Sequence, residues 1–409
     1  MNTADLTCVH LAASFIFSTT ILVLYTSYLT SSAVLIGLVP AVQQMGFMLP
    51  QLLMARRAEA LCRKKPFVVK VSTLERVPYL FIALFVLIWR EPPAWLAYAV
   101  LITSIAVASG SGGMASPAWK AMLGKVIHPK RRGLLFSSGY GVGGLLGVGG
   151  AALAGHILQS RPYPVSFGLC FLLAFLAQAL SWSFLTLNRE PPRKPERTAP
   201  TFAAYVRALP EVLRSNRNFS YYILAMVLIL LGGMGISFHV LYAREVFSIG
   251  DGFAASLTVV ALISQSIGTP LLGIFADSCG HKRLAELSTI LGGGAVVLVL
   301  VLRSAGWLYP VFALVNLCTA GLMVSRFSIT MEFGHADKVP TYTAVSGTIL
   351  AVPTLLAPII GGWLLDATDF RTLFAVALVL YLAGLAVMLL AVADPRVKRL
   401  RKQTAGPRE

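Results

Sequence analysis

Residues 370–393 read FRTLFAVALVLYLAGLAVMLLAVA, an apolar run whose one charged residue is Arg371. A helix needs about 20 mostly apolar residues to cross the hydrocarbon core of a membrane. The run therefore predicts a membrane-spanning helix, and the rest of the chain repeats the pattern. The twelve predicted spans are residues 8–28, 33–55, 67–90, 94–116, 133–158, 164–187, 219–242, 253–276, 284–303, 306–330, 341–366 and 370–393.

The composition of the whole chain agrees with this reading. Of 409 residues, 56% are hydrophobic and only 12% are charged, about half the charged share of ordinary globular proteins. A soluble fold could not cover so much apolar surface with polar groups. The long continuous runs also exclude a membrane β-barrel, whose strands alternate over about ten residues. The expected fold class is an all-α membrane protein.

The chain is strongly basic, with 34 Lys and Arg against 17 Asp and Glu. Most of these basic residues lie in connections on one side of the predicted helices, as at 56–65, 120–132 and 189–217, and in the tail. This is the positive-inside pattern of membrane proteins, so no nucleic-acid partner is expected. It predicts a multi-pass protein of the plasma (inner) membrane with both termini in the cytoplasm. The five cysteines are scattered and indicate no disulfide framework, metal site or cofactor.

One polar stretch divides the twelve predicted spans into six plus six. We expect a first half at 1–188, a cytoplasmic linker at 189–218 with an amphipathic segment at 202–213, a second half at 219–393 and a basic cytoplasmic tail at 394–409. A shift of 220 residues places Pro50 on Pro270 and one basic loop on another. Two related halves are a known plan of transporters.

One loop of the second half carries a resemblance to a known family. The sequence Gly273-Ile274-Phe275-Ala276-Asp277-Ser278-Cys279-Gly280-His281-Lys282-Arg283 resembles the G-x-x-x-D-x-x-G-x-[KR] loop signature of the major facilitator superfamily. The helix number, the central linker and the basic loops are also similar to that family. The resemblance implies a 6+6 helix bundle with halves related by a pseudo-two-fold axis, expected to be a monomer in the lipid bilayer.

The signature implies a conformational latch at the cytoplasmic side. Gly273 lacks a side chain and would allow a close helix approach, and Gly280 permits a turn. The Asp277 carboxylate would face the positive N-terminus of the predicted helix at 133–158, while Lys282 and Arg283 keep the loop in the cytoplasm. In the first half Arg57 replaces the aspartate, so no equivalent latch is expected there. A charged turn without a latch function is the alternative.

Polar residues inside the predicted spans are candidates for substrate binding, because they are unfavourable in lipid unless they serve a function or find a partner. The candidates are Gln44, Ser264, Gln265, Asn316 and Tyr140. Neutral amides and hydroxyls suit a polar solute. Hydrogen bonding between helices is the alternative role for each of them.

Glu75 and Arg76 form the one charged pair clearly inside a predicted span. A carboxylate in a medium of low dielectric constant can carry protons, so the pair is the candidate coupling site. A structural ion pair is the alternative. A separate ladder of Gly139, Gly143 and Gly147 predicts close packing of one helix against another.

The sequence as a whole predicts a secondary active transporter of a small organic solute that works by alternating access. Export coupled to protons is one form of this function. Uptake of a sugar or an organic acid, and a non-transporting membrane sensor on the same fold, are alternatives that the sequence leaves open. An enzyme is not expected, because neither an H-E-x-x-H motif nor a phosphate-binding G-x-x-x-x-G-K-[ST] motif occurs.

Overall fold

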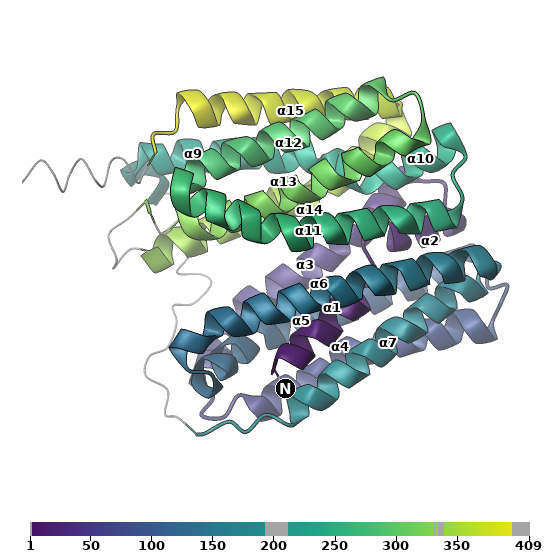
Figure 1. The fold of residues 1–409 in the computed structure, drawn as a ribbon, viewed down its shortest axis with the longest axis horizontal. Coiled ribbons are helices and arrows are strands. Elements are labelled where there is room, and N and C mark those ends of the chain that lie inside the picture. Colours follow the sequence, from purple (N-terminus) through teal and green to yellow (C-terminus); the bar gives the residue numbers. More distant parts are fainter. Residues whose placement is uncertain (1, 193–211, 331, 334–338, 395–409) are drawn as a thin grey trace, which may run out of the picture. The chain divides into compact units, whose positions relative to one another are not determined.

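The computed structural model describes residues 2–192, 212–330, 332–333 and 339–394, and its ribbon is shown in Figure 1. The amphipathic segment expected at 202–213 and the basic tail lie almost wholly outside these residues. In the described ranges all regular structure is helical, as expected. The α-helices are α1 (Asn2–Phe15), α2 (Ile21–Leu29), α3 (Ala33–Ala60), α4 (Lys65–Ile88), α5 (Ala94–Val126), α6 (Pro129–Ser160), α7 (Val165–Thr186), α9 (Arg217–Gly232), α10 (His239–Phe247), α11 (Asp251–Cys279), α12 (His281–Val301), α13 (Leu308–Ile329), α14 (Val339–Ala367) and α15 (Phe370–Leu390).

The first predicted span differs from the structure. A single helix at 8–28 is expected, but the chain forms α1 and α2 with a break at residues 16–20. The break contains Ser18, Thr19 and Thr20, whose hydroxyls compete with the helical hydrogen bonds of the backbone. Of the other helical segments in the described residues, 11 are long and apolar enough to cross a membrane. Together with the α1–α2 pair they account for the twelve predicted spans.

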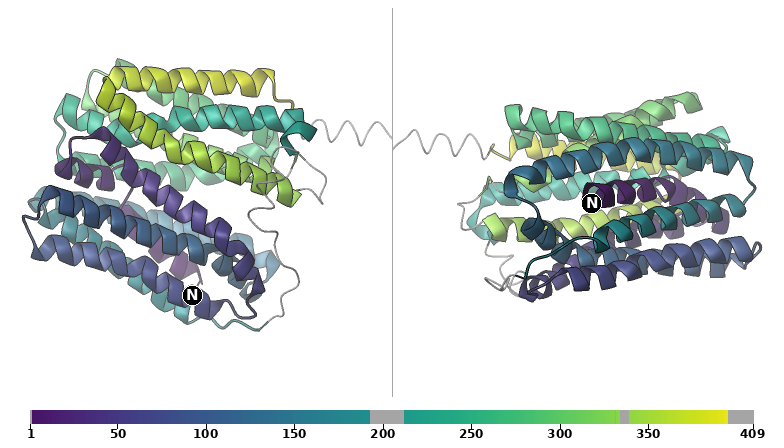
Figure 2. Two further views of the ribbon diagram at one scale, coloured as in Figure 1. Left: turned by 180° about the vertical axis from the view of Figure 1, so that it is seen from behind. Right: turned by 60° about the horizontal axis from the view of Figure 1, so that its bottom comes forward.

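The chain forms two compact units. Unit 1 contains Met1–Phe202 and Ser237–Ser266, and unit 2 contains Ala203–Ile236 and Ile267–Glu409. Residues 237–266, which the sequence division assigns to the second half, therefore pack with unit 1. Within each unit the helices run lengthwise beside one another (Figure 2). We call the end of unit 1 that carries the connections 61–64 and 127–128 its basic end; the opposite end carries 30–32, 161–164 and 248–250.

Small residues decide how the helices of unit 1 approach one another. Helix α3 lies against α5, where a Cβ on Gly113 would collide with the backbone carbonyl of Phe47. The glycine ladder of α6 packs against α1: a Cβ on Gly143 would lie 2.9 Å from the Cβ of His10. The close packing expected for the ladder is confirmed. Helix α1 also packs against α7, and α7 packs against the charged helix α4.

Unit 2 is organised around Tyr381 of α15. The ring is almost fully buried. It packs against Gly232 of α9 and Gly292 of α12, where an added Cβ would lie 3.0 Å from ring atoms. Gly384 in turn leaves room for Ile229. Because three helices meet at one aromatic ring, α9, α12 and α15 form one closely packed group.

Candidate functional site

A network of buried charged groups joins three helices inside unit 1. Asp5 of α1 is 3% exposed and Arg76 of α4 is 6% exposed. The Ser181 hydroxyl of α7 donates to Asp5 Oδ1 at 2.6 Å, and Arg76 Nη2 donates to Ser181 Oγ at 3.0 Å. The hydroxyl therefore bridges the carboxylate and the guanidinium, and it links α1, α4 and α7 through polar contacts.

The guanidinium of Arg76 has further partners. Its Nε donates to the Gln178 carbonyl at 2.8 Å, and Nη1 donates to the Ser72 carbonyl at 2.8 Å. Nη1 also lies 3.2 Å from Glu75 Oε2. Glu75 and Arg76 therefore contact each other although adjacent helical positions point about 100° apart, because the long arginine side chain reaches back to its neighbour. Arginine carries a fixed positive charge, so it anchors this network.

Glu75 occupies space that Gly112 of α5 leaves open. A Cβ on Gly112 would lie 2.9 Å from Glu75 Oε1, so a larger residue there would displace the carboxylate. On the other side of the network, Trp119 of α5 donates its indole N–H to Asp5 Oδ2 at 3.4 Å. Helix α5 therefore contacts both carboxyl groups.

The number of charges in this network is uneven. Asp5 and Glu75 can each carry a negative charge, and among the described side chains that hydrogen-bond within this network Arg76 supplies one positive charge. A buried charge without compensation is unfavourable, and the group tends to become neutral instead. The arrangement is therefore suited to binding and releasing one proton. Sequence reasoning missed Asp5, although it is the one acidic residue before the first apolar run.

The structure distributes the predicted substrate-binding residues over both units. Gln44 of α3 is exposed, and Ser264 and Gln265 of α11 are half-buried, all three in unit 1. Asn316 of α13 is buried in unit 2, and its Nδ2 donates to the Phe312 carbonyl at 2.8 Å. The side chain of Tyr140 lies outside the described residues.

The signature loop connects α11 and α12 in unit 2. Gly280 has φ 99°, a conformation that favours glycine, so it makes the turn expected of it. The close approach expected at Gly273 is not seen, because a Cβ there would meet nothing within 4 Å. Asp277 is exposed. Lys282 Nζ pairs with Glu286 Oε1 one helical turn later at 3.0 Å.

At the basic end of unit 1, the carboxylate of Glu190, which follows α7, binds the start of α4. Glu190 Oε2 accepts hydrogen bonds from the backbone N–H groups of Lys64 and Lys65, at 2.6 and 2.7 Å. Its Oε1 pairs with Lys125 Nζ at 2.8 Å. Burial raises the pKa of Glu190, but these three hydrogen bonds outweigh it and hold the pKa below its ordinary value. Glu190 therefore places a negative charge at the N-terminus of α4. Arg57, which stands in the first half where the second half has Asp277, cannot supply that charge.

Contacts at the opposite end of unit 1 join α2 to α10 and α11. The Tyr28 hydroxyl lies 2.7 and 3.0 Å from the two carboxylate oxygens of Asp251. Arg244 lies 4.0 Å above the Tyr28 ring and donates to Ser27 Oγ at 3.0 Å. Deeper in the unit, the hydroxyls of Thr20 and Thr258 lie 2.5 Å apart. Sequence reasoning did not identify this contact, since its residues are more than 200 positions apart.

Comparison with known proteins agrees with this architecture. The family model described as Major Facilitator Superfamily matches residues 6–264 and 235–409. The chain is 25% identical over 179 residues to the MFS-type transporter SLC18B1 of Mus musculus, a match covering 40% of this chain and 39% of that protein. It is 28% identical over 158 residues to a Na(+), Li(+), K(+)/H(+) antiporter of Planococcus maritimus, covering 37% of each. The aligned regions thus span less than half the length of these relatives.

Solved structures share the fold over almost the whole chain. A mutant of the nucleoside transporter NupG matches with a TM-score of 0.72 at 12% identity, covering 95% of this chain and 99% of that one. A D-xylose-proton symporter matches with a TM-score of 0.69 at 15% identity, covering 96% and 98%. The human organic anion transporter MFSD10 matches with a TM-score of 0.63 at 15% identity, covering 95% and 97%. The expected helical transporter fold is confirmed.

Proposed function

Because the chain belongs to the major facilitator superfamily, we propose that it is a secondary active transporter that exports a small organic solute across the plasma membrane in exchange for protons. Alternating access around a site between related halves is the general mechanism for such folds. The observation that carries the proton coupling is the buried network of Asp5, Ser181, Arg76 and Glu75. Similarity to a protein named as an antiporter supports exchange rather than passive movement.

The network supplies a physical reason for coupling. When Asp5 and Glu75 are both ionised, the positive charge of Arg76 compensates only one of them. Binding one proton neutralises the excess negative charge inside the helix bundle, so the protonated and deprotonated states favour different environments of the site. A conformational change that alters water access to Glu75, whose side chain is 26% exposed, then couples proton release to transport.

The solute site in this proposal lies at the polar residues of the spans. Gln44, Ser264, Gln265, Asn316 and Tyr140 supply amide and hydroxyl groups, which suit a polar solute that bears hydrogen-bonding groups. Gln44 is the strongest of these candidates because its side chain is exposed on α3. Asn316 is weaker, since its Nδ2 already donates to a carbonyl of its own helix.

The signature loop is the proposed latch. Gly280 makes the turn, Lys282 and Arg283 hold the loop on the cytoplasmic side, and Asp277 offers its carboxylate to the N-terminus of another helix. Gly273 gives a neighbouring helix room to approach α11 closely when the latch is closed; in this structure nothing lies within 4 Å of its Cβ position. The latch forms and breaks as the transporter changes state.

Reconstituted vesicles test the function directly. We expect one member of a panel of small organic solutes to move against an imposed proton gradient. Glu75→Gln and Asp5→Asn should lose this gradient-driven transport and keep exchange of labelled for unlabelled solute, which requires no net proton movement. Glu91→Gln, at an exposed site between α4 and α5, is the matched control.

Two results would contradict parts of the proposal. Gradient-driven transport by Glu75→Gln and Asp5→Asn at the rate of the parent would make the network purely structural. Movement of the solute in the same direction as the protons would replace export by uptake, as in a symporter.

A further inference from the structure

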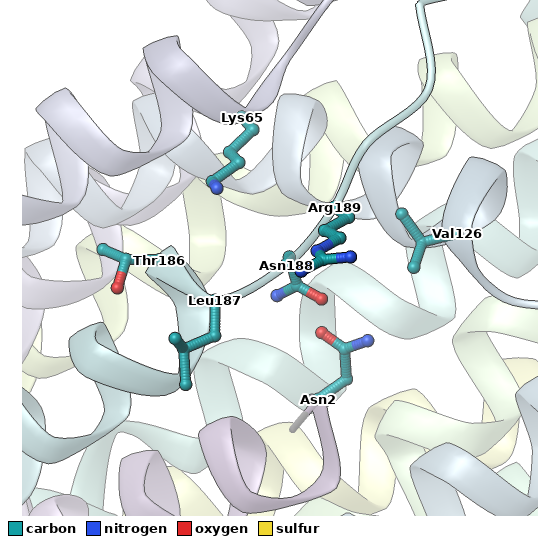
Figure 3. A pocket seen from close by; sticks show the side chains of 7 residues that line it. All are labelled: Asn2, Lys65, Val126, Thr186, Leu187, Asn188 and Arg189. Atoms are coloured by element: carbon teal, nitrogen blue, oxygen red, sulfur yellow. The ribbon is translucent and has the colours of Figure 1, made fainter.

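A cavity of about 720 Å³ opens at the basic end of unit 1, where the ends of α1, α4, α5 and α7 meet (Figure 3). Its volume is in the range of small-ligand sites. It is separate from the proton network and the proposed solute site. It is lined by Asn2, Lys65, Val126, Thr186, Leu187, Asn188 and Arg189.

The cavity holds two positive charges without partners. Neither the Lys65 amino group nor the Arg189 guanidinium forms a hydrogen bond or ion pair with any residue in the part of the chain that the structure describes. The carboxylate of Glu190, the residue after Arg189, binds other groups. Its Oε1 binds Lys125 Nζ, and its Oε2 binds the backbone N–H groups of Lys64 and Lys65. The cavity is therefore electrostatically suited to an anion.

A buried amide adds hydrogen-bonding capacity. Asn2 Oδ1 is shielded from solvent and accepts no hydrogen bond from the described residues. In Figure 3 the amides of Asn2 and Asn188 point toward each other from opposite walls of the cavity. Such an unpaired buried group is unfavourable, and the hydroxyl of a bound ligand would satisfy it. A phosphate that carries a hydroxylated substituent combines both requirements.

An apolar row on α7 leads to the rim of the cavity. Leu176 and Leu180 of α7, and Leu187 at its C-terminal cap, are 52%, 50% and 54% exposed. Their spacing of four and seven residues puts them on one face of the helix. The row extends for about 17 Å at ~1.5 Å per residue, close to the ~15 Å depth of one leaflet of hydrocarbon. This length matches an acyl chain that begins at the cavity.

We propose that this cavity binds the headgroup of an anionic glycerophospholipid of the cytoplasmic leaflet. Its phosphate lies between Lys65 and Arg189, its headgroup hydroxyl reaches Asn2, and one acyl chain follows the leucine row of α7. Basic pockets at cytoplasmic helix ends are known to attract such lipids. The inference uses the cytoplasmic orientation that the charge pattern predicts, and it is independent of the transported solute.

Binding of a short-chain phosphatidylglycerol to the purified protein in neutral detergent tests this assignment, read by native mass spectrometry. The variant Lys65→Ala/Arg189→Ala should weaken binding by about thirtyfold, from ~1 kcal/mol for each charge. Arg57→Ala/Arg63→Ala removes two exposed basic residues that do not line the cavity and should retain the affinity of the parent. Leu187→Gln should weaken binding while leaving both charges in place. Size-exclusion profiles establish that each variant is folded.

Three outcomes would overturn the assignment. Equal affinity in Lys65→Ala/Arg189→Ala and the parent would remove the cavity as the site. An equal loss in Arg57→Ala/Arg63→Ala would reduce the effect to general surface charge. Displacement of the lipid by inorganic phosphate or glycerol 3-phosphate at comparable concentration, with no effect of Leu187→Gln, would identify a site for a free phosphate instead of a lipid.

Discussion

The hydroxyl of Tyr28 lies 2.7 Å from one carboxylate oxygen of Asp251 and 3.0 Å from the other, across 223 residues of sequence. The same tyrosine ring lies beneath the guanidinium of Arg244 and stacks on Tyr163 at 4.5 Å between centroids. These contacts hold the end of α2 against α10 and α11. In a transporter that works by alternating access, they would have to separate when this end opens.

Tyr28→Phe should therefore favour opening at that end. The variant removes the hydroxyl that binds Asp251 and keeps the ring for Tyr163 and Arg244. A partly exposed hydrogen bond contributes ~1 kcal/mol, which is about fivefold in a two-state population. The measurement is external labelling of a cysteine placed at Thr258, which is fully buried in this structure. Tyr163→Phe is the control, and labelling of Tyr28→Phe no faster than the parent would show that the contact does not restrain opening.

Arg76 should be essential for stability because two carboxyl groups depend on it. Arg76→Met leaves a buried charge uncompensated, a change of about 3–5 kcal/mol. The double variant Arg76→Met/Glu75→Gln should recover part of the folded protein, since it removes one of the charges. Thermal unfolding in detergent, with Arg371→Met at an exposed position as control, measures both. No recovery in the double variant would mean that Arg76 acts mainly through its bonds to Gln178, Ser72 and Ser181.

Glu190→Gln should lower thermal stability near neutral pH and matter less in acid. The pKa of Glu190 lies below its ordinary value of 4.5 in the folded protein, since the hydrogen bonds from Lys125, Lys65 and Lys64 outweigh its burial. Its stabilisation is therefore fully present above that ordinary value and is lost as the pH falls through the folded pKa. The difference in melting temperature between parent and variant, measured from pH 7 down to pH 3, should shrink toward the acid end. A constant difference would assign the effect to packing instead of charge.

Asp277→Asn should populate a state open to the cytoplasm, whereas Arg57→Asn should have little effect. In the proposed latch Asp277 faces the N-terminus of another helix, an interaction worth ~0.3–2 kcal/mol depending on burial, whereas the first-half loop has Arg57 at the equivalent position. Accessibility of a cysteine in the solute pathway, labelled from the cytoplasmic side, compares the two variants. Equal accessibility in Asp277→Asn and the parent would leave Asp277 as a topological charge.

The orientation of the chain can be tested with its own thiols. Cys62 is exposed between α3 and α4 at the basic end, whereas Cys8, Cys170 and Cys318 are buried. We expect a membrane-permeant maleimide to modify Cys62 in intact cells and an impermeant one to leave it unmodified. Ser160→Cys, exposed at the opposite end of unit 1, should react with both reagents. Labelling of Cys62 by the impermeant reagent would reverse the predicted topology.

The sequence by itself determined where the helices lie and which ends carry the basic loops. Continuous apolar runs specify membrane spans through their length alone, and positive charge specifies the side through its position between the runs. The sequence also predicts the close packing at the glycine ladder of α6, because close helix packing requires small side chains at helical spacing. Gly280 was identified in the same way, since its turn needs a conformation that glycine adopts readily.

Only the tertiary structure decided which polar groups meet. Asp5 and Ser181 are 176 positions apart, and Glu190 reaches Lys64 across 126 positions. Successive helical residues point about 100° apart, so an uncertainty of one or two residues in the rotation of a helix changes the neighbour that each side chain faces. At the end of the break at residues 16–20, the Thr20 hydroxyl likewise meets a partner on a distant helix, Thr258 of α11. Apolar length is a local property of the chain, whereas contact between polar groups depends on the packing of whole helices.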